Sequence, residues 1–182
     1  MRLFHFSEDD SIGRFVPRPV ATASARPPGR EWLNGPLVWA IDEWHQPMYF
    51  FPRDCPRILV WPTDRTSERD RRAFRATTSH RMVAFVEQRW MSIIQETVLH
   101  RYDLPPASFQ SLDDAGMWVS RRDVVPTTRQ EVGALLLALR RANIEVRPLD
   151  DLLALRGLWA TSLHASGIRL RNAIGWSRQD DA

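Results

Sequence analysis

The sequence predicts an α+β fold in which small, mostly antiparallel sheets surround an aromatic core. Three observations lead to this class. Short apolar runs of strand length recur along the chain. Most of these runs end at Pro or at polar turn residues. Helical patterns stand out only late, near residues 128–142 and 150–164. The 182 residues suit a single domain, which we place at residues 1–176.

The first third of the chain predicts strands joined by loops. Residues 3–6, LFHF, form a short strand, and the almost continuous apolar run 37–41 predicts a strand buried on both faces. A third strand covers residues 57–61, RILVW, and stops at Pro62. Residues 20–35 are rich in Pro and Gly and poor in apolar side chains, so they predict a mobile loop.

The middle of the chain is ambiguous. Residues 66–75 predict a short polar helix with Thr66 as its cap. Residues 81–104 fit either a strand, a helical turn and a second strand, or one long helix over 82–99, because their apolar residues also recur at helical spacing. Residues 116–120, GMWVS, predict a further short strand.

The last third carries the clearest helix signals. Thr128 and Glu131 match the T-x-x-E capping box, which predicts that the helix 128–142 begins there. Asn143 is a suitable left-handed residue at its end. Asp150 is expected to cap the second helix, 150–164. Residues 177–182 are expected to fray.

The charge pattern limits the choice of partners. All 25 basic residues are Arg, so Schiff-base lysine chemistry and a phosphate-binding loop with Lys are excluded. Arg and acidic residues are interspersed, and the net charge is only +3. We therefore expect a small-molecule or nucleotide ligand and no nucleic-acid partner. The sequence does not indicate an oligomeric state.

Other features favour a cytoplasmic protein without a membrane segment. No apolar run reaches the length of a membrane span, and the N-terminus lacks the apolar region of a secretory signal. The one cysteine, Cys55, excludes an internal disulfide. Its neighbours Arg53 and Arg57 could activate a nucleophilic thiol, but a lone Cys is usually a small buried hydrophobe, and we expect the latter.

The richest functional signal is the block 38–58, which mixes large aromatic residues with ionisable ones. Asp42 and His45 stand three residues apart, so on a helical turn they share a face. They form either an oriented acid–base pair or a surface pair at a strand end. Trp39 and Tyr49 are candidate pocket walls. No zinc motif and no third ligand accompany the pair, and we expect no metal site.

Further candidates lie near both ends of the chain. His5 in the first strand is either a hydrogen-bonded structural residue or, with Ser7, a catalytic and sugar-binding pair. Arg18, Arg53, Arg169 and Arg171 are candidate ligands for an anion, since a guanidinium binds phosphate or carboxylate through two hydrogen bonds. If the segment around Arg169 and Arg171 is extended, both side chains project to one side and suit either an anion or surface ion pairs.

Several motifs resemble those of a family of bacterial proteins that has no assigned activity. They are LFHFSED at the start, VWAID followed by YFFPRDCPRI, then RYDLPP, and SGIRLRNA near the end. The resemblance covers nearly the whole chain. It implies membership of a domain family of unknown function and brings no catalytic residues with it.

A more distant similarity is to the ADP-ribosyltransferase-like fold. There an early strand carries a His followed by a hydroxyl residue, as His5 and Ser7 do here, and Tyr49 resembles the aromatic residue after the second strand. The fold also uses a late glutamate, but here Met117 and Ser120 stand in that region. The similarity implies an enzyme that takes NAD or a related nucleotide as its substrate and cleaves the glycosidic bond or transfers ADP-ribose.

In that hypothesis His5, Asp42 and His45 are the catalytic residues. Two alternatives stay open. One is a non-catalytic module that binds a small molecule or peptide, and the other is a small-molecule enzyme that uses Asp42 and His45 as its acid–base pair. The enzyme hypothesis depends on the segment at His5 and the aromatic block 38–58 meeting to wall one cleft, and an informative observation is whether the strand at His5 and the strand at 37–41 are neighbours in one sheet.

Overall fold

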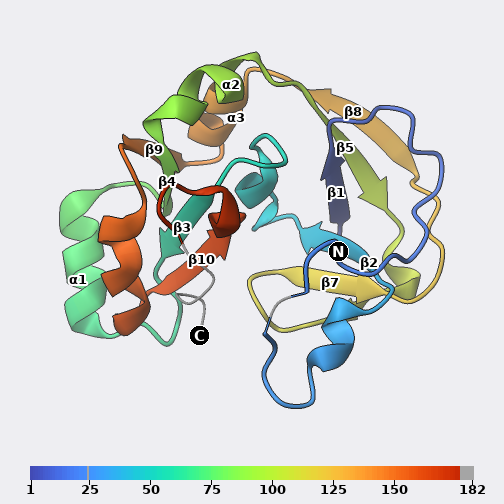
Figure 1. Cartoon of the computed structure of the whole chain (residues 1–182), viewed down its shortest axis with the longest axis horizontal. Coiled ribbons are helices and arrows are strands. Elements are labelled where there is room, and N and C mark those ends of the chain that lie inside the picture. The colour runs from blue at the N-terminus through green and yellow to red at the C-terminus, as the bar shows by residue number, and fades with distance from the viewer. Residues whose placement is uncertain (24, 177–182) are drawn as a thin grey trace. The chain divides into compact units, whose positions relative to one another are not determined.

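A computed structural model describes residues 1–23 and 25–176, which form two compact units (Figure 1). Unit 1 contains residues 1–46 and 99–132, and unit 2 contains residues 47–98 and 133–176 of the described chain. Both units combine sheets with helical segments, so the α+β class is confirmed. The assignment of residues 1–176 to one domain stays a prediction, and the predicted frayed tail, 177–182, lies outside the described residues.

Unit 1 is built on a six-stranded sheet in which every neighbouring pair is antiparallel. The strand order is β6-β7-β2-β1-β5-β8. The strands are β1 (Leu3–Ser7), β2 (Val38–Asp42), β5 (Leu99–Leu104), β6 (Gln110–Ser111), β7 (Met117–Ser120) and β8 (Thr128–Val132). The strand at His5 and the strand at 37–41 are therefore neighbours, with Leu3 opposite Asp42.

The unit 1 sheet buries apolar side chains on both faces, because alternate residues of a strand point to opposite sides. Val38 and Ala40 of β2 pack in one cluster with Leu3, whereas Trp39 packs in the other cluster with Leu37. Short 3₁₀ helices η1 (Glu31–Asn34) and η4 (Pro106–Ser108) lie in the connections. The described part of the predicted mobile loop 20–35 thus includes a helical turn.

Unit 2 is built on a four-stranded sheet with the order β10-β3-β4-β9. Its strands are β3 (Arg57–Trp61), β4 (Met82–Glu87), β9 (Ile144–Leu149) and β10 (His164–Ile168). The pair β4–β9 is parallel and the other two pairs are antiparallel. Its helices are α1 (Glu68–Thr77), α2 (Met91–Glu96) and α3 (Leu135–Arg141), and its 3₁₀ segments are η3 (Gln88–Trp90), η5 (Leu153–Ala160) and η6 (Leu170–Asn172). A further 3₁₀ turn, η2 (Gln46–Tyr49), follows β2 along the chain.

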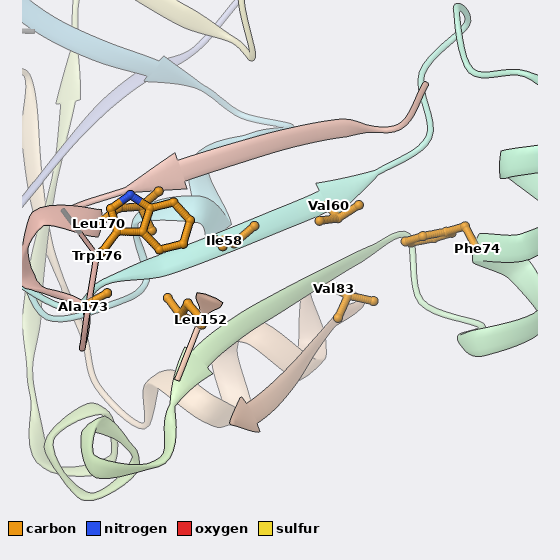
Figure 2. Close-up of a cluster of buried hydrophobic side chains, with 8 residues drawn as sticks. All are labelled: Ile58, Val60, Phe74, Val83, Leu152, Leu170, Ala173 and Trp176. Carbon is orange, nitrogen blue, oxygen red and sulfur yellow. The ribbon is translucent and has the colours of Figure 1, made fainter. Parts of the chain in front are cut away.

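A cluster of buried side chains covers one face of the unit 2 sheet (Figure 2). Figure 2 shows Val60, Val83 and Phe74 at one end of the cluster. At the other end, Leu152, Leu170, Ala173 and Trp176 gather around Ile58. Phe74 is the buried residue of α1, so this one side chain anchors an otherwise polar helix to the core. The cap of α1 is Ser67, which accepts a hydrogen bond from the amide of Asp70, and not Thr66 as predicted.

The prediction of a helix over 128–142 is wrong in its first part. Residues 128–132 form β8, and Arg129 lies opposite Tyr102 of β5. The helix α3 starts only at Leu135, after Ala134 in the left-handed conformation, with φ of 46°. A capping box is a local signal, and here the backbone hydrogen bonds of a sheet edge outweigh it. Asn143 is left-handed as predicted, with φ of 61°.

The predicted helix 150–164 is also wrong in type and extent. Its middle is the 3₁₀ segment η5, and His164 already belongs to β10, where it lies opposite Trp61. The cap position of the segment is Leu152 and not Asp150, and Asp151 before it accepts a hydrogen bond from the amide of Leu153. For residues 81–104, the alternative of a strand, a helical turn and a second strand is confirmed. None of the helices in residues 1–23 and 25–176 combines the length and the apolar character that a membrane crossing requires.

Candidate functional site

The candidate site is the Asp42–His45 pair at the end of β2 in unit 1. The chain turns after Asp42, and its Oδ1 accepts a hydrogen bond of 2.8 Å from the amide of His45. This contact folds the imidazole back onto the carboxylate. Nδ1 of His45 then lies 2.8 Å from Oδ1 and 3.0 Å from Oδ2 of Asp42. A carboxylate only accepts hydrogen bonds, so Nδ1 carries the proton and, in neutral His45, Nε2 carries the lone pair.

The surroundings of the pair favour the ionised form of the Asp42 carboxylate. Burial raises the pKa of Asp42, but the hydrogen bonds from the ring and the amide of His45 more than offset this, and the pKa lies below its usual value. The side chains of Asp42 and His45 keep 28% and 19% of their surface exposed, so a small molecule can reach the pair from solvent. The ring of Trp44 packs edge-on against His45 at a centroid distance of 4.4 Å and limits its rotation.

The hydrogen-bonded carboxylate of Asp42 gives the first prediction, a dependence of stability on pH. Because the folded pKa of Asp42 is lowered, its carboxylate stabilises the fold above its ordinary pKa of 3.8, and this contribution is lost as the pH falls through the folded value. On going from about pH 5 to about pH 3, urea unfolding should show a larger loss of stability for the natural protein than for Asp42→Asn. The exposed Asp64 supplies the control, Asp64→Asn. Equal losses for all three proteins would contradict the prediction.

Gly116 completes the surroundings of the pair, although it was not among the predicted site residues. It directly precedes β7, and its φ is +70°. Its carbonyl accepts a hydrogen bond from the amide of Asp42. A Cβ at this position would lie 2.2 Å from Nδ1 of His45 and 2.6 Å from Oδ2 of Asp42. Its turn also holds Asp113 and Ala115 at positive φ. Left-handed residues other than Gly store backbone strain, and such strain is common at functional sites.

His5 lies on the same face of the sheet as Asp42, because Leu3 is opposite Asp42 and His5 is two residues further along β1. Its Nδ1 donates a 2.9 Å hydrogen bond to the carbonyl of Trp39. Its ring lies 4.7 Å from that of Phe15. The hydroxyl of Ser7 is buried and accepts a hydrogen bond from the amide of Asp9. These contacts hold both side chains in place, and the alternation of β1 puts Ser7 on the same face as His5, two residues further from Leu3.

Two other candidates of unit 1 lie away from the pair. Trp39 projects from the opposite face of β2, and its indole Nε1 is buried without a hydrogen-bond partner in the described chain. Arg18 pairs through its backbone with Leu37, before the start of β2, whereas Asp42 stands at its end. The structure therefore places Asp42 and His45 in contact, puts His5 on the same sheet face as Asp42, and leaves Trp39 and Arg18 elsewhere in unit 1.

The remaining candidates gather in unit 2. Nε of Arg169 donates to the carbonyl of Arg53 at 3.1 Å, and Asn172 donates to the carbonyl of Asp54 at 2.7 Å. Burial, followed by the charges of Arg171 and Arg53, lowers the pKa of Arg169. The expected extended conformation is wrong here, because Arg169 is left-handed, with φ of 58°, and Arg171 lies in the 3₁₀ segment η6.

Cys55 and Arg57 are structural residues of unit 2. Cys55 is fully buried, and burial raises the pKa of its thiol to about 12. Arg57 is 2% exposed and donates to the carbonyls of Met48 and Cys55 at 2.9 Å each. Its guanidinium faces the rings of Tyr49 and Phe51. Arg57 thus binds backbone carbonyls and packs on aromatic rings of its own unit.

The burial of Cys55 gives the second prediction. Because the thiolate is the reactive form, a thiol with a pKa of about 12 should react slowly with a disulfide reagent at neutral pH. The folded protein should react at least about 100-fold more slowly than the protein unfolded in urea. Equal rates in the two states, measured by release of the chromophore, would contradict the burial of this residue.

The described residues contain no group of three or more His, Cys, Asp or Glu side chains placed to hold a metal ion. The comparisons with known proteins give a family and nothing further. A family model described as "Family of unknown function (DUF6886)" matches residues 4–173, nearly the whole chain. No curated protein matches the sequence, and no solved structure does.

Proposed function

The chain belongs to this family of unknown function, and from its own residues we propose that it is an enzyme in which His45, oriented by Asp42, serves as the acid–base group for a small-molecule substrate. One observation carries the proposal. Nδ1 of His45 lies within 3.0 Å of both carboxylate oxygens of Asp42. The carboxylate fixes the tautomer, so Nε2 can take a proton from a substrate, and it stabilises the imidazolium that then forms.

Other contacts support a catalytic rather than a purely structural role. A capping carboxylate needs only the backbone amide of His45, yet Asp42 also binds the ring. Gly116 leaves just enough room for the pair, at the cost of a strained turn. His5 supplies a second imidazole on the same face, and its Nδ1 bond to a carbonyl leaves the lone pair on Nε2 when the ring is neutral.

A direct test compares the turnover of a metabolite pool by variants. The purified protein is incubated with a pool that includes NAD and nucleotides, and consumed compounds are found by mass spectrometry. We expect at least one compound to be consumed by the natural protein and about 100-fold more slowly or not at all by His45→Ala. The matched control is His80→Ala, because His80 also faces a carboxylate, with Nδ1 3.7 Å from Oε2 of Glu145.

The outcomes separate the proposals. Equal turnover by His45→Ala and the natural protein would remove His45 as the acid–base group. A pool left unchanged by the natural protein would favour the alternative of a non-catalytic module that binds a small molecule or peptide. We further propose a cytoplasmic location, which the single buried thiol supports.

A second candidate function is binding of NAD or a related nucleotide, with glycosidic-bond cleavage or ADP-ribosyl transfer. The observation that favours it is the gathering of Arg53, Arg169 and Arg171 in unit 2, since guanidinium groups bind phosphate. Calorimetry at millimolar NAD tests it. Binding should be lost in Arg169→Gln and retained in Arg75→Gln, a change on the exposed side of α1. Absence of heat with the natural protein would end this candidate.

A further inference from the structure

Unit 2 contains an apolar cavity of about 300 Å³ that none of the residues discussed above as site candidates lines. Its floor is the sheet, where Val60 of β3 and Val83 and Phe85 of β4 share one face. Its walls are α1 on one side and the end of η5 on the other, through Phe74 and Leu158. The cavity thus lies at the Phe74 end of the core cluster in Figure 2.

The packing explains why space remains at this end. At the opposite end, Trp176, Leu170 and Leu152 fill the volume around Ile58 (Figure 2). Near Val60 and Val83 the buried partner is Phe74 of α1, whereas Leu158 and Leu163 are only partly buried. A volume of about 300 Å³ is at the small end of ligand pockets and suits a molecule of roughly 8 to 12 non-hydrogen atoms.

Three of the four polar side chains in the lining are already engaged. The hydroxyl of Thr77 donates to the carbonyl of Phe74 at 2.8 Å, and that of Thr161 donates to the carbonyl of Leu158 at 2.7 Å. The carboxylate of Asp70 accepts from the amide and hydroxyl of Ser162 at 2.8 and 2.6 Å. None of these three groups has a donor left for a ligand.

Arg147 is the fourth polar residue of the lining, and it differs from the others. Its Nε and Nη2 donate to the two carboxylate oxygens of Glu145 at 2.8 and 3.0 Å, and Nη2 also donates to the carbonyl of Thr77 at 2.6 Å. Within the part of the chain that the structure describes, its other terminal nitrogen, Nη1, makes no hydrogen bond. The contacts with Glu145 and Thr77 fix the guanidinium of Arg147, a residue that lines this apolar space.

The charges at the wall select the kind of ligand. Glu145 already balances the charge of Arg147, and Asp70 adds a negative charge, so a ligand carboxylate would meet no net positive field. A ligand ammonium would face the guanidinium of Arg147, whose counter-charge, Glu145, already accepts two hydrogen bonds from it. We propose that this cavity binds a small neutral apolar molecule with one hydrogen-bond acceptor, such as an aryl ketone, whose carbonyl accepts from Nη1 of Arg147.

Four probes with one phenyl body and different head groups test the proposal. They are acetophenone, ethylbenzene, benzoate and 1-phenylethylamine, and binding to the full chain is followed by NMR of the methyl groups of Val60, Val83, Leu158 and Leu163. Acetophenone should shift these signals saturably and bind about 5-fold more tightly than ethylbenzene and at least about 10-fold more tightly than either charged probe. Tighter binding of a charged probe, or no saturable shift with acetophenone, would overturn it.

Two variants assign the contacts. Arg147→Met should reduce the affinity for acetophenone to that for ethylbenzene, and unchanged affinity would refute the role of Nη1. Arg147→Met also removes the partner of Glu145 and could disturb the wall for that reason. A second variant therefore blocks the cavity while leaving the Arg147–Glu145 contact intact. Ala73→Trp on α1 fills the cavity and should abolish binding of all probes, whereas Ala76→Trp on the same helix lies outside the lining and should not. Retained binding in Ala73→Trp would place the ligand elsewhere.

Discussion

Replacing Gly116 by Ala should lower the free energy of unfolding by about 2 to 4 kcal/mol and disrupt the Asp42–His45 pair. Two costs combine at this position. The backbone φ of +70° disfavours any side chain, and the added Cβ would stand 2.2 Å from Nδ1 of His45. The ring cannot yield easily, because Asp42 and Trp44 hold it on two sides. Urea unfolding measures the loss.

Gly29 provides a matched control for this substitution. It also has positive φ, +81°, but a Cβ there would find no atom within 4 Å. Gly29→Ala should therefore show the backbone cost alone, about 1 kcal/mol. The difference between the two variants is the cost of displacing the pair. If Gly116→Ala costs no more than Gly29→Ala, the close approach of the turn to His45 is not a real constraint. Any turnover found with the natural protein should fall in Gly116→Ala and persist in Gly29→Ala.

The second large effect is expected at Arg57. Its charge is buried among aromatic rings, and none of the described carboxylates forms an ion pair with it. Burial lowers its pKa to about 10, which shows that the fold bears a desolvation cost at this residue. The fork of the guanidinium compensates by satisfying the carbonyls of Met48 and Cys55. We expect Arg57→Met to lose about 2 to 4 kcal/mol, because two buried carbonyls lose their donors.

A comparison with Arg57→Lys separates the two contributions. Lys keeps the buried charge but cannot reach both carbonyls with a fixed fork, so it should be less stable than Arg57→Met. Chemical unfolding of the three proteins at one pH should show the free energy of unfolding falling from the natural protein to Arg57→Met and then to Arg57→Lys. If Arg57→Met were as stable as the natural protein, relief of the buried charge would outweigh the two hydrogen bonds.

The fold class and most strands could be predicted because they depend on apolar runs bounded by Pro and Gly. The errors occurred where local and long-range signals disagree. Thr128 and Glu131 match a helix cap, but the same residues pair with β5, and no local pattern reveals a partner strand so far back in the sequence, as for Leu99 and Val132. His164 was assigned to a helix for the same reason, since its partner Trp61 is distant in sequence.

The candidate site was predictable in part. The spacing of Asp42 and His45 within one turn was enough to suggest that they touch, and strand alternation accounts for His5 lying on the same sheet face as Asp42. Gly116 could not be chosen among eight glycines, because its role depends on the pairing of β7 with β2. Trp39 was grouped with Asp42 by closeness in sequence, whereas the alternation of a strand turns it to the other face.

The way the two units share the chain has a consequence for biosynthesis. Each unit is assembled from two stretches, so the chain leaves unit 1 after residue 46 and returns to it at residue 99. On the ribosome, β1 and β2 emerge early but wait for more than half of the polypeptide before β5 and β8 complete their sheet. A nascent chain halted before residue 99 would expose the unpaired edge of β1, and a chaperone that shields strand edges should bind it at that stage.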